Sequence, residues 1–181
     1  PYHELEVILL QNHRWDNRIN NLKPSLIKDN HLIFDFNDEN VFPGGNEYRR
    51  FDMRSLRYKS ERIRHFLPDS GGTHLILYAD ETRTIKRYNP ETDLNGNRFV
   101  HIQEGSDDDV ESDYVWVHFR LAYDVPVHEG TLYVFGALSD WQCTDEFKMK
   151  FNKDAFGYAT VALLKQGYYN YEYVLLKDRT T

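Results

Sequence analysis

The chain has 181 residues, of which 28% are charged and 15% aromatic, and its formal net charge is −7 at pH 7. This length allows one large domain or two small ones, and the negative charge argues against general nucleic-acid binding, which needs positive charge to displace counterions. The single cysteine, Cys143, excludes an internal disulfide and a four-cysteine zinc site. No apolar run approaches the ~18 residues of a membrane-spanning helix, so we expect no membrane insertion. The opening at Pro1, without an initiator Met or a signal peptide, is expected of a mature product or an excised fragment.

The first hundred residues alternate between apolar and polar side chains with a period of two, which indicates strands. Residues 11–23 are polar and rich in Asn, so we expect a long loop there. The sequences PGGN at residues 43–46 and Asn95-Gly96 are typical of turns. The strands expected in this part of the chain are residues 4–10, 31–36, 47–54, 60–66, 74–79 and 98–103.

A basic run with interspersed aromatic residues follows the first turn, with seven Lys or Arg between Arg49 and Arg64. A basic groove with aromatic side chains could stack nucleic-acid bases, but Glu47, Asp52 and Glu61 are interleaved here. Alternating charge along a strand more often prevents edge aggregation or contacts a protein partner. We therefore predict a partner-binding face, with the candidate residues Tyr48, Arg50, Arg54, Arg57 and Tyr58.

The chain changes character at residues 105–113, GSDDDVESD, which are acidic and poor in apolar residues and are typical of a linker. After it, residues 114–123 alternate cleanly, with Val115, Val117, Phe119 and Leu121 on one face. Further strands are expected at residues 131–135, 147–151, 158–164 and 168–176. This pattern predicts an all-β protein of two tandem immunoglobulin-like β-sandwich domains, residues 1–105 and 106–181.

Catalytic and cofactor motifs are absent from the sequence. The glycine pairs at residues 44–45 and 71–72 lack the Lys and the spacing of a phosphate-binding loop. No two of the eight His lie three to five residues apart, as paired metal ligands would. We therefore expect no enzymatic activity, no metal site and no cofactor, and Cys143 is interpreted as structural.

Calcium binding is the one metal hypothesis with a local pattern. Asp93, Asn95 and Asn97 alternate as in the start of a calcium loop, and Glu104 stands at the twelfth position. Residues 98–103 between them have the pattern of a strand, which favours a turn at Asn95-Gly96. The acidic residues of the 105–113 segment could also chelate a cation, but a solvated linker is the simpler interpretation.

A first resemblance covers residues 132–174, which are similar to immunoglobulin-like modules of the glycogen-binding and branching-enzyme kind. The matching residues are Phe135-Gly136, Leu138-Ser139-Asp140-Trp141, Phe147-Lys148-Met149, Gly157-Tyr158 and Gly167-Tyr168-Tyr169-Asn170-Tyr171-Glu172-Tyr173. In such modules exposed aromatic rings stack on sugars, so the resemblance implies a glycan site at Trp141 and Tyr158. Here Tyr158 replaces the usual second Trp and Glu172 replaces a basic residue, and Trp141 could instead pack under its own turn.

A second resemblance extends over nearly the whole chain. The matching strings are LLQNHRWDNRINNLKP (9–24), DENVFPGGNEYRRFDMRSLRY (38–58), ETDLNGNRFV (91–100), SDYVWVHFRL (112–121), YVFGALSDWQ (133–142) and LLKQGYYNYEYVLL (163–176). They resemble the plug protein family of the type IX secretion system, whose members carry additional regions before and after the matching part. The resemblance implies a periplasmic, outer-membrane-associated protein that closes the periplasmic opening of the translocon barrel and catalyses nothing.

Three functional hypotheses of different class follow from these resemblances. The first is a non-enzymatic gating subunit whose partner is the outer-membrane translocon barrel protein. The alternative is a glycan-binding β-sandwich module, and a third hypothesis is an accessory domain of a carbohydrate enzyme.

Overall fold

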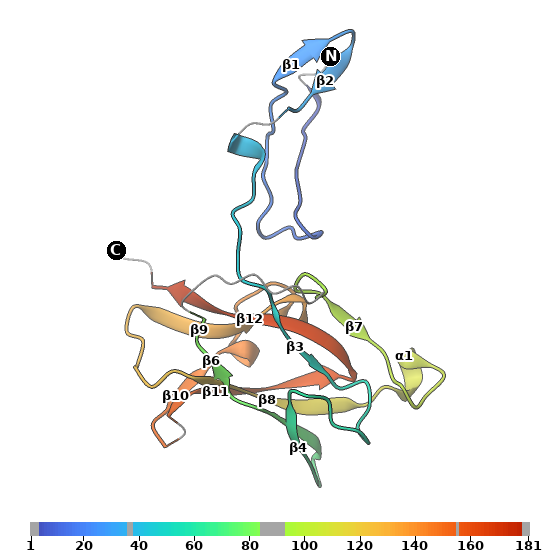
Figure 1. Ribbon diagram of the computed structural model, residues 1–181, viewed down its shortest axis with the longest axis vertical. Coiled ribbons are helices and arrows are strands. Elements are labelled where there is room, and N and C mark those ends of the chain that lie inside the picture. Colours follow the sequence, from blue (N-terminus) through green and yellow to red (C-terminus); the bar gives the residue numbers. More distant parts are fainter. Residues whose placement is uncertain (1–3, 36–37, 84–92, 155, 179–181) are drawn as a thin grey trace. The chain divides into compact units, whose positions relative to one another are not determined.

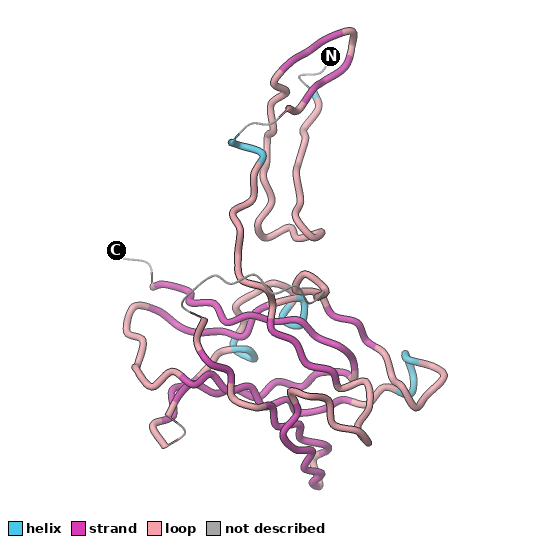
Figure 2. Tube along the Cα trace, in the orientation of Figure 1, coloured by secondary structure: helices cyan, strands magenta, loops and turns pink. Residues whose placement is uncertain are grey.

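The computed structural model divides the chain into two compact units, Pro1–Gly45 and Asn46–Thr181. It describes residues 4–35, 38–83, 93–154 and 156–178. Figure 2 shows that strands and loops form nearly all of the described chain and that helix is confined to short turns. The prediction of an all-β protein is therefore confirmed. Among the described residues, no helix is both long and apolar enough to cross a membrane.

The first unit contains one short hairpin, in which β1 (Leu26–Lys28) pairs with β2 (His31–Ile33). Asp29 and Asn30 make its turn with φ values of 48° and 62°, a left-handed conformation that Asp and Asn tolerate. A 3-10 helix, Asp38–Asn40, follows. None of the described residues between 4 and 45 is buried, so this unit contributes nothing to the hydrophobic core of the protein.

The strand expected at residues 4–10 does not form, although Leu9 and Ile19 make an isolated bridge. The sequence ELEVILL is apolar enough for a strand, but a strand needs a partner along its length. The loop expected at residues 11–23 is confirmed apart from that bridge. Phe36, the expected end of the next strand, and Glu91, which opens one of the matching strings, lie outside the described residues.

The second unit is a β-sandwich whose two sheets form separate layers in Figure 1. One sheet has the order β10-β11-β8-β5-β4, with β6 beside β8, and the other has the order β3-β12-β7, with β9 beside β12. The strands of the first sheet are β4 (Ile63–Asp69), β5 (Gly72–Leu77), β6 (Asp80–Glu81), β8 (Tyr114–Ala122), β10 (Lys150–Asn152) and β11 (Gly157–Lys165). Those of the second are β3 (Arg49–Asp52), β7 (Arg98–Val100), β9 (Gly130–Phe135) and β12 (Gly167–Lys177).

The core lies between the two sheets and follows from the period-two pattern. Val115, Val117, Phe119 and Leu121 of β8 are all at most 5% exposed, as the alternation predicts. Aromatic rings join the layers, since Phe119 of β8 lies edge-to-face on Phe51 of β3 with ring centroids 5.8 Å apart. The expected strands 47–54, 60–66, 74–79 and 98–103, and all those expected after residue 114, are present with shifted ends.

The expected domain boundary at residue 105 is wrong, because strands from both sides of it share each sheet. β5 pairs in parallel with β8, and β3 and β7 both pair with β12. Residues 46–181 therefore fold as one sandwich, and the proposed pair of domains 1–105 and 106–181 is not found. Alternation shows which face of a strand is buried, but it carries no information about which strands pair.

The expected linker at residues 105–113 is instead a hydrogen-bonded connection between β7 and β8. It contains the short helix α1 (Asp108–Glu111), and the Asp107 side chain caps that helix by accepting from the Asp109 backbone N–H. The Asp108 carboxylate accepts from the Ile102 backbone N–H at 2.9 Å and from the His101 ring. The acidic residues thus satisfy local donors within one domain.

Candidate protein-interaction surface

The exposed face of β3 carries the arginines that the sequence singles out. Burial alternates along this strand, so Arg49 and Phe51 point into the core while Arg50 and Asp52 lie on the outer face. Arg54, two residues beyond Asp52, continues this outer row and is partly exposed. Arg50, Asp52 and Arg54 therefore share the outer face, as a period of two along this strand requires.

Asp52 and Arg54 form a bidentate ion pair on this face. The Arg54 guanidinium donates to the Asp52 carboxylate through Nε at 2.9 Å and Nη2 at 2.6 Å, and the Arg54 backbone N–H donates at 3.0 Å. Burial raises the pKa of the Asp52 carboxyl, but the hydrogen bonds from Arg54 outweigh burial and hold that pKa below its ordinary value. The pair presents a guanidinium in a fixed orientation rather than a mobile charge.

Aromatic residues from two neighbouring strands complete the surface. Tyr168 of β12 pairs with Asp52 of β3 and with Phe99 of β7, so the three side chains form one cross-strand row. The Arg54 guanidinium lies 5.9 Å from the centre of the Tyr168 ring, a cation–π distance. Phe99 is 51% exposed and its ring stacks on His101 at 5.4 Å. We call Arg50, Asp52, Arg54, Phe99, His101 and Tyr168 the β3–β7 face.

Only part of the predicted partner-binding set belongs to this face. Arg50 and Arg54 lie on it, whereas Tyr48 packs its ring edge-to-face against Trp141 at 6.2 Å. Arg57 and Tyr58 lie in the loop after β3, where their backbone N–H groups donate to the Ser55 hydroxyl. The Tyr58 side chain is 75% exposed and is available for contact.

The residues missed by sequence analysis are Tyr168, Phe99 and His101. Their alternation was visible within their own strands, but their position beside Arg54 depends on the pairing of β12 with both β3 and β7. A single sequence does not show that pairing.

The structure corrects the expected glycan site at Tyr158, whose side chain is only 6% exposed. Its ring packs against Phe151 at 5.2 Å, and its hydroxyl accepts from the Val127 backbone N–H at 2.6 Å. A buried ring cannot stack on a sugar. Trp141 is half-buried and lies edge-to-face on Phe135 at 5.6 Å as well as on Tyr48, which agrees with a packing role.

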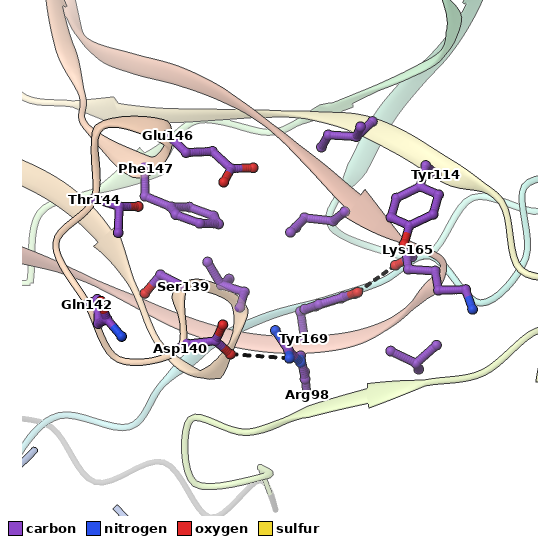
Figure 3. Close-up of a pocket in the computed structure, with 14 residues that line it drawn as sticks. Arg98, Tyr114, Ser139, Asp140, Gln142, Thr144, Glu146, Phe147, Lys165 and Tyr169 are labelled. Carbon is purple, nitrogen blue, oxygen red and sulfur yellow. Dashed lines mark hydrogen bonds and ion pairs between the residues drawn. The ribbon is translucent and has the colours of Figure 1, made fainter. Parts of the chain in front are cut away.

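A cavity of about 400 Å³ lies beside the Trp141 turn (Figure 3). Its polar groups include the ion pair between Arg98 and Asp140, at 3.2 Å, and the side chains of Gln142 and Glu146. In Figure 3 the Tyr169 ring lies among these residues, and its hydroxyl donates to the Lys165 carbonyl at 2.5 Å. Burial raises the pKa of Tyr169 to about 12.

The turn at Asn95-Gly96 forms as expected, since both residues have positive φ, 51° and 80°, and Asn97 N donates to Leu94 O at 3.0 Å. Asp93 is used locally, accepting from the backbone N–H groups of Asn95 and Tyr48. Glu104 accepts instead from the Ser55 hydroxyl. Over the described ranges, no group of three or more His, Cys, Asp or Glu side chains is placed to hold a metal ion.

Comparison with known proteins finds a similar solved structure. No protein-family model matches the chain, and no curated protein gives a significant match. The crystal structure of a hypothetical protein from Parabacteroides merdae ATCC 43184 resembles it with a TM-score of 0.83 and 32% sequence identity, over 95% of this chain and 43% of that one. The chain thus spans a little over two fifths of that protein's length.

Proposed function

We propose that this chain belongs to a non-enzymatic plug subunit of a type IX secretion translocon, located in the periplasm and bound to the outer-membrane barrel. The observation that carries the proposal is the series of strings that resemble the plug family in order along the chain. One of these strings contains Arg50 and Arg54, which lie on the exposed β3–β7 face.

The physical character of that face supports a reversible protein contact. Tyr and Arg are enriched at the anchors of protein interfaces, because both combine a large apolar area with polar groups. The Arg54 guanidinium is held by Asp52 and lies over Tyr168, so little side-chain entropy is lost when it is contacted. A plug must open as well as close. A surface of ordered charges binds its partner well only when the whole contact is formed, so the contact is reversible.

Co-purification with the isolated translocon barrel tests this proposal. Replacing Arg50, Arg54 and Arg57 together by Glu should abolish retention of the chain by the barrel, whereas Arg64→Glu, a charge reversal on β4, should not. Moderate salt should weaken retention of the unchanged chain, because exposed charges are screened. Equal retention of the triple variant and the control would exclude the β3–β7 face. Absence of retention of the unchanged chain would exclude the plug role.

Glycan binding is the second candidate, favoured by the cavity in Figure 3 rather than by the expected site. Tyr114, which lines this cavity, is 62% exposed, and Asp140, Gln142 and Glu146 supply hydrogen-bonding groups elsewhere in the lining. A cavity whose lining combines an exposed ring with planar polar side chains is suited to a sugar. Titration with soluble oligosaccharides should show binding that Tyr114→Ala removes and Trp141→Ala retains, and the reverse pattern would restore Trp141 as the site.

A further inference from the structure

Two neighbouring rows of side chains cover the outer face of the six-stranded sheet. The strand register aligns Leu67, His74, Trp116 and Leu163 in one row and His65, Ile76, His118 and Val161 in the next. Residues between them along the strands, such as Leu75, Val117 and Ala162, are buried in the core, so these eight side chains lie on the opposite face. We call the eight residues the β4–β11 face.

The β4–β11 face is more apolar than a sheet surface that meets water usually is. Five of its eight positions are Leu, Ile, Val or Trp, and the other three are His. None of the eight is Asp, Glu, Lys or Arg, although these types make up 28% of the chain. Leu67, Val161 and Leu163 are 53%, 41% and 36% exposed. A solvated sheet face is normally polar, and a continuous exposed apolar patch marks a site of interaction.

The rings at the centre of this face are held in place by one another. His118 Nε2 lies 2.9 Å from His74 Nδ1. The His74 ring stacks on that of Trp116 with centroids 6.3 Å apart, and Trp116 Nε1 donates to the Gly71 carbonyl at 3.4 Å. The face is therefore preorganised, and little side-chain entropy is lost when a partner covers it.

The two ends of the face differ in charge. Apart from the buried Asp80, the strands of this sheet carry six charged residues: Asp69 and Lys165 at one end, and Arg64, Glu81, Arg120 and Lys150 at the other. Lys165 lies beside helix α1, because its Nζ donates to the Asp109 carbonyl, and this helix adds three acidic side chains to the first end. The first end thus has four carboxylates and one Lys, whereas the second has three basic side chains and one Glu.

A face with this pattern is complementary to itself. A second copy related by a two-fold axis that crosses the strands would bring the acidic end of each copy against the basic end of the other. The same rotation places one row against the other, so that Leu163 meets Val161 of the second copy and Trp116 meets its His118. Such a contact is isologous, the commonest arrangement in homodimers.

The size of the face fits a weak dimer. Four strands about 4.8 Å apart and four rows about 6.7 Å apart, including the row of side chains at each end, span roughly 500 Å². Two copies would bury about 1,000 Å² in total, at the lower limit for specific interfaces. We therefore expect reversible association rather than a permanent dimer.

We propose that the β4–β11 face binds a second copy of this chain and forms a two-fold symmetric dimer in which the facing strands run antiparallel. The proposal rests on this face alone and does not require the plug role.

Analytical ultracentrifugation of the full chain tests the dimer at pH 8, where ordinary imidazoles are neutral. Between about 5 and 500 µM the mean mass should rise from one chain toward two, with a Kd of about 50 µM. A single chain at every concentration would overturn the proposal. Growth beyond two chains would overturn the closed, two-fold arrangement.

A matched pair of variants locates the contact. Leu163→Arg should weaken the dimer about tenfold or more, because the new charge loses its water when the faces meet. Leu176→Arg, the same change on β12 of the other sheet at a residue that is 52% exposed, should leave the Kd unchanged. Circular dichroism confirms folding, and Val161→Arg replaces Leu163→Arg if that variant does not fold. Equal dimerisation of the folded variants of the two sheets would refute the assignment.

A charge exchange tests the antiparallel arrangement, which places β4 against β4 of the second copy. Arg64 lies at the bulge of β4 and is exposed on the outer side, because Ile63 before it and Phe66 after His65 pack inward. The axis brings it near Asp69 of the other copy. Asp69→Arg and Arg64→Asp should each weaken the dimer about threefold, and the double variant should regain the original Kd. Additive weakening in the double variant would exclude this arrangement.

Discussion

Arg49 on β3 and Asp80 on β6 form a buried ion pair that joins the two sheets of the sandwich, with Arg49 Nε 3.4 Å from Asp80 Oδ1. Their side chains are 9% and 6% exposed. The Arg49 guanidinium also lies 5.2 Å from the centre of the Tyr173 ring. Charges are costly to bury, so this pair is stable only because each member has several partners.

Replacing Asp80 by Asn should therefore be strongly destabilising. The change keeps the shape of the side chain but leaves the Arg49 charge buried without a counter-ion, a loss of about 3–5 kcal/mol in comparable pairs. The free energy of unfolding, measured by urea denaturation, gives the size of the effect. Glu81→Gln is the matched control, since the Glu81 residue is exposed and next in the chain; equal stabilities of the two variants would contradict a structural role for the pair.

Alkaline unfolding should begin above pH 10 because Tyr169 and Tyr171 are buried in this core, and the partly buried Tyr173 donates its hydroxyl to Asp80 beside them. Burial raises the pKa of Tyr169 to about 12, and burial together with Asp80 raises the pKa values of Tyr171 and Tyr173 well above 10. The unfolded chain releases these protons near pH 10 and the folded chain does not, so stability is complete below pH 10 and falls as pH rises above it.

The phenolate absorbance, followed together with circular dichroism, checks this prediction. A group of tyrosines should ionise only as the fold is lost. Tyr169→Phe removes one of the three groups, so its unfolding free energy should decline less steeply with pH than that of the unchanged chain. Ionisation of every tyrosine in the intact fold would disprove the assignment.

The inward faces of β3 and β8 could be predicted from the sequence because alternation reports burial directly. The same rule predicts that Tyr158 is buried, because it shares a face of its strand with the buried residues Ala162 and Leu164. The resemblance to sugar-binding modules instead predicted that the Tyr158 ring is exposed. For Trp141, which lies in a turn with φ of 58°, no alternation exists and only the structure shows its contacts.

The burial of Asp80 could not be predicted, because it depends on which strands pair. Asp80 becomes buried when β6 pairs in parallel with β8, a contact between residues about forty positions apart. Nothing in the local sequence of residues 79–83 distinguishes a buried Asp from a solvated one. The charge of Arg49 was visible, but its pairing with Asp80 was not.

A chain shortened to residues 46–181 should unfold with nearly the same free energy as the full chain. Every residue of the hydrophobic core lies between Phe51 and Tyr171, and burial of apolar area is the main stabilising term in folding. Chemical denaturation of both chains measures this. A loss of several kcal/mol, or a fragment without a cooperative transition, would show that residues 1–45 contribute to the fold of the sandwich.

Acid should weaken the fold through a histidine pair on the outer face of the six-stranded sheet. His118 Nε2 lies 2.9 Å from His74 Nδ1, so one of these nitrogens donates and the other must be unprotonated. His74 Nε2 lies 3.0 Å from Asp69 Oδ2, and the His74 ring stacks against Trp116. Desolvation and the neighbouring charge of His74 lower the pKa of His118 below 6.5.

Because the folded pKa of His118 is depressed, the unfolded chain binds a proton more readily than the folded chain once the pH falls below 6.5. The stability from this residue is complete above pH 6.5 and is lost as the pH falls through the folded pKa. His118→Gln should flatten the decline of unfolding free energy between about pH 7 and pH 5, whereas His65→Gln, an exposed position on β4 of the same sheet, should not. Denaturation at a series of pH values decides the matter, since parallel profiles for the unchanged chain and His118→Gln would show that the pair does not titrate with folding.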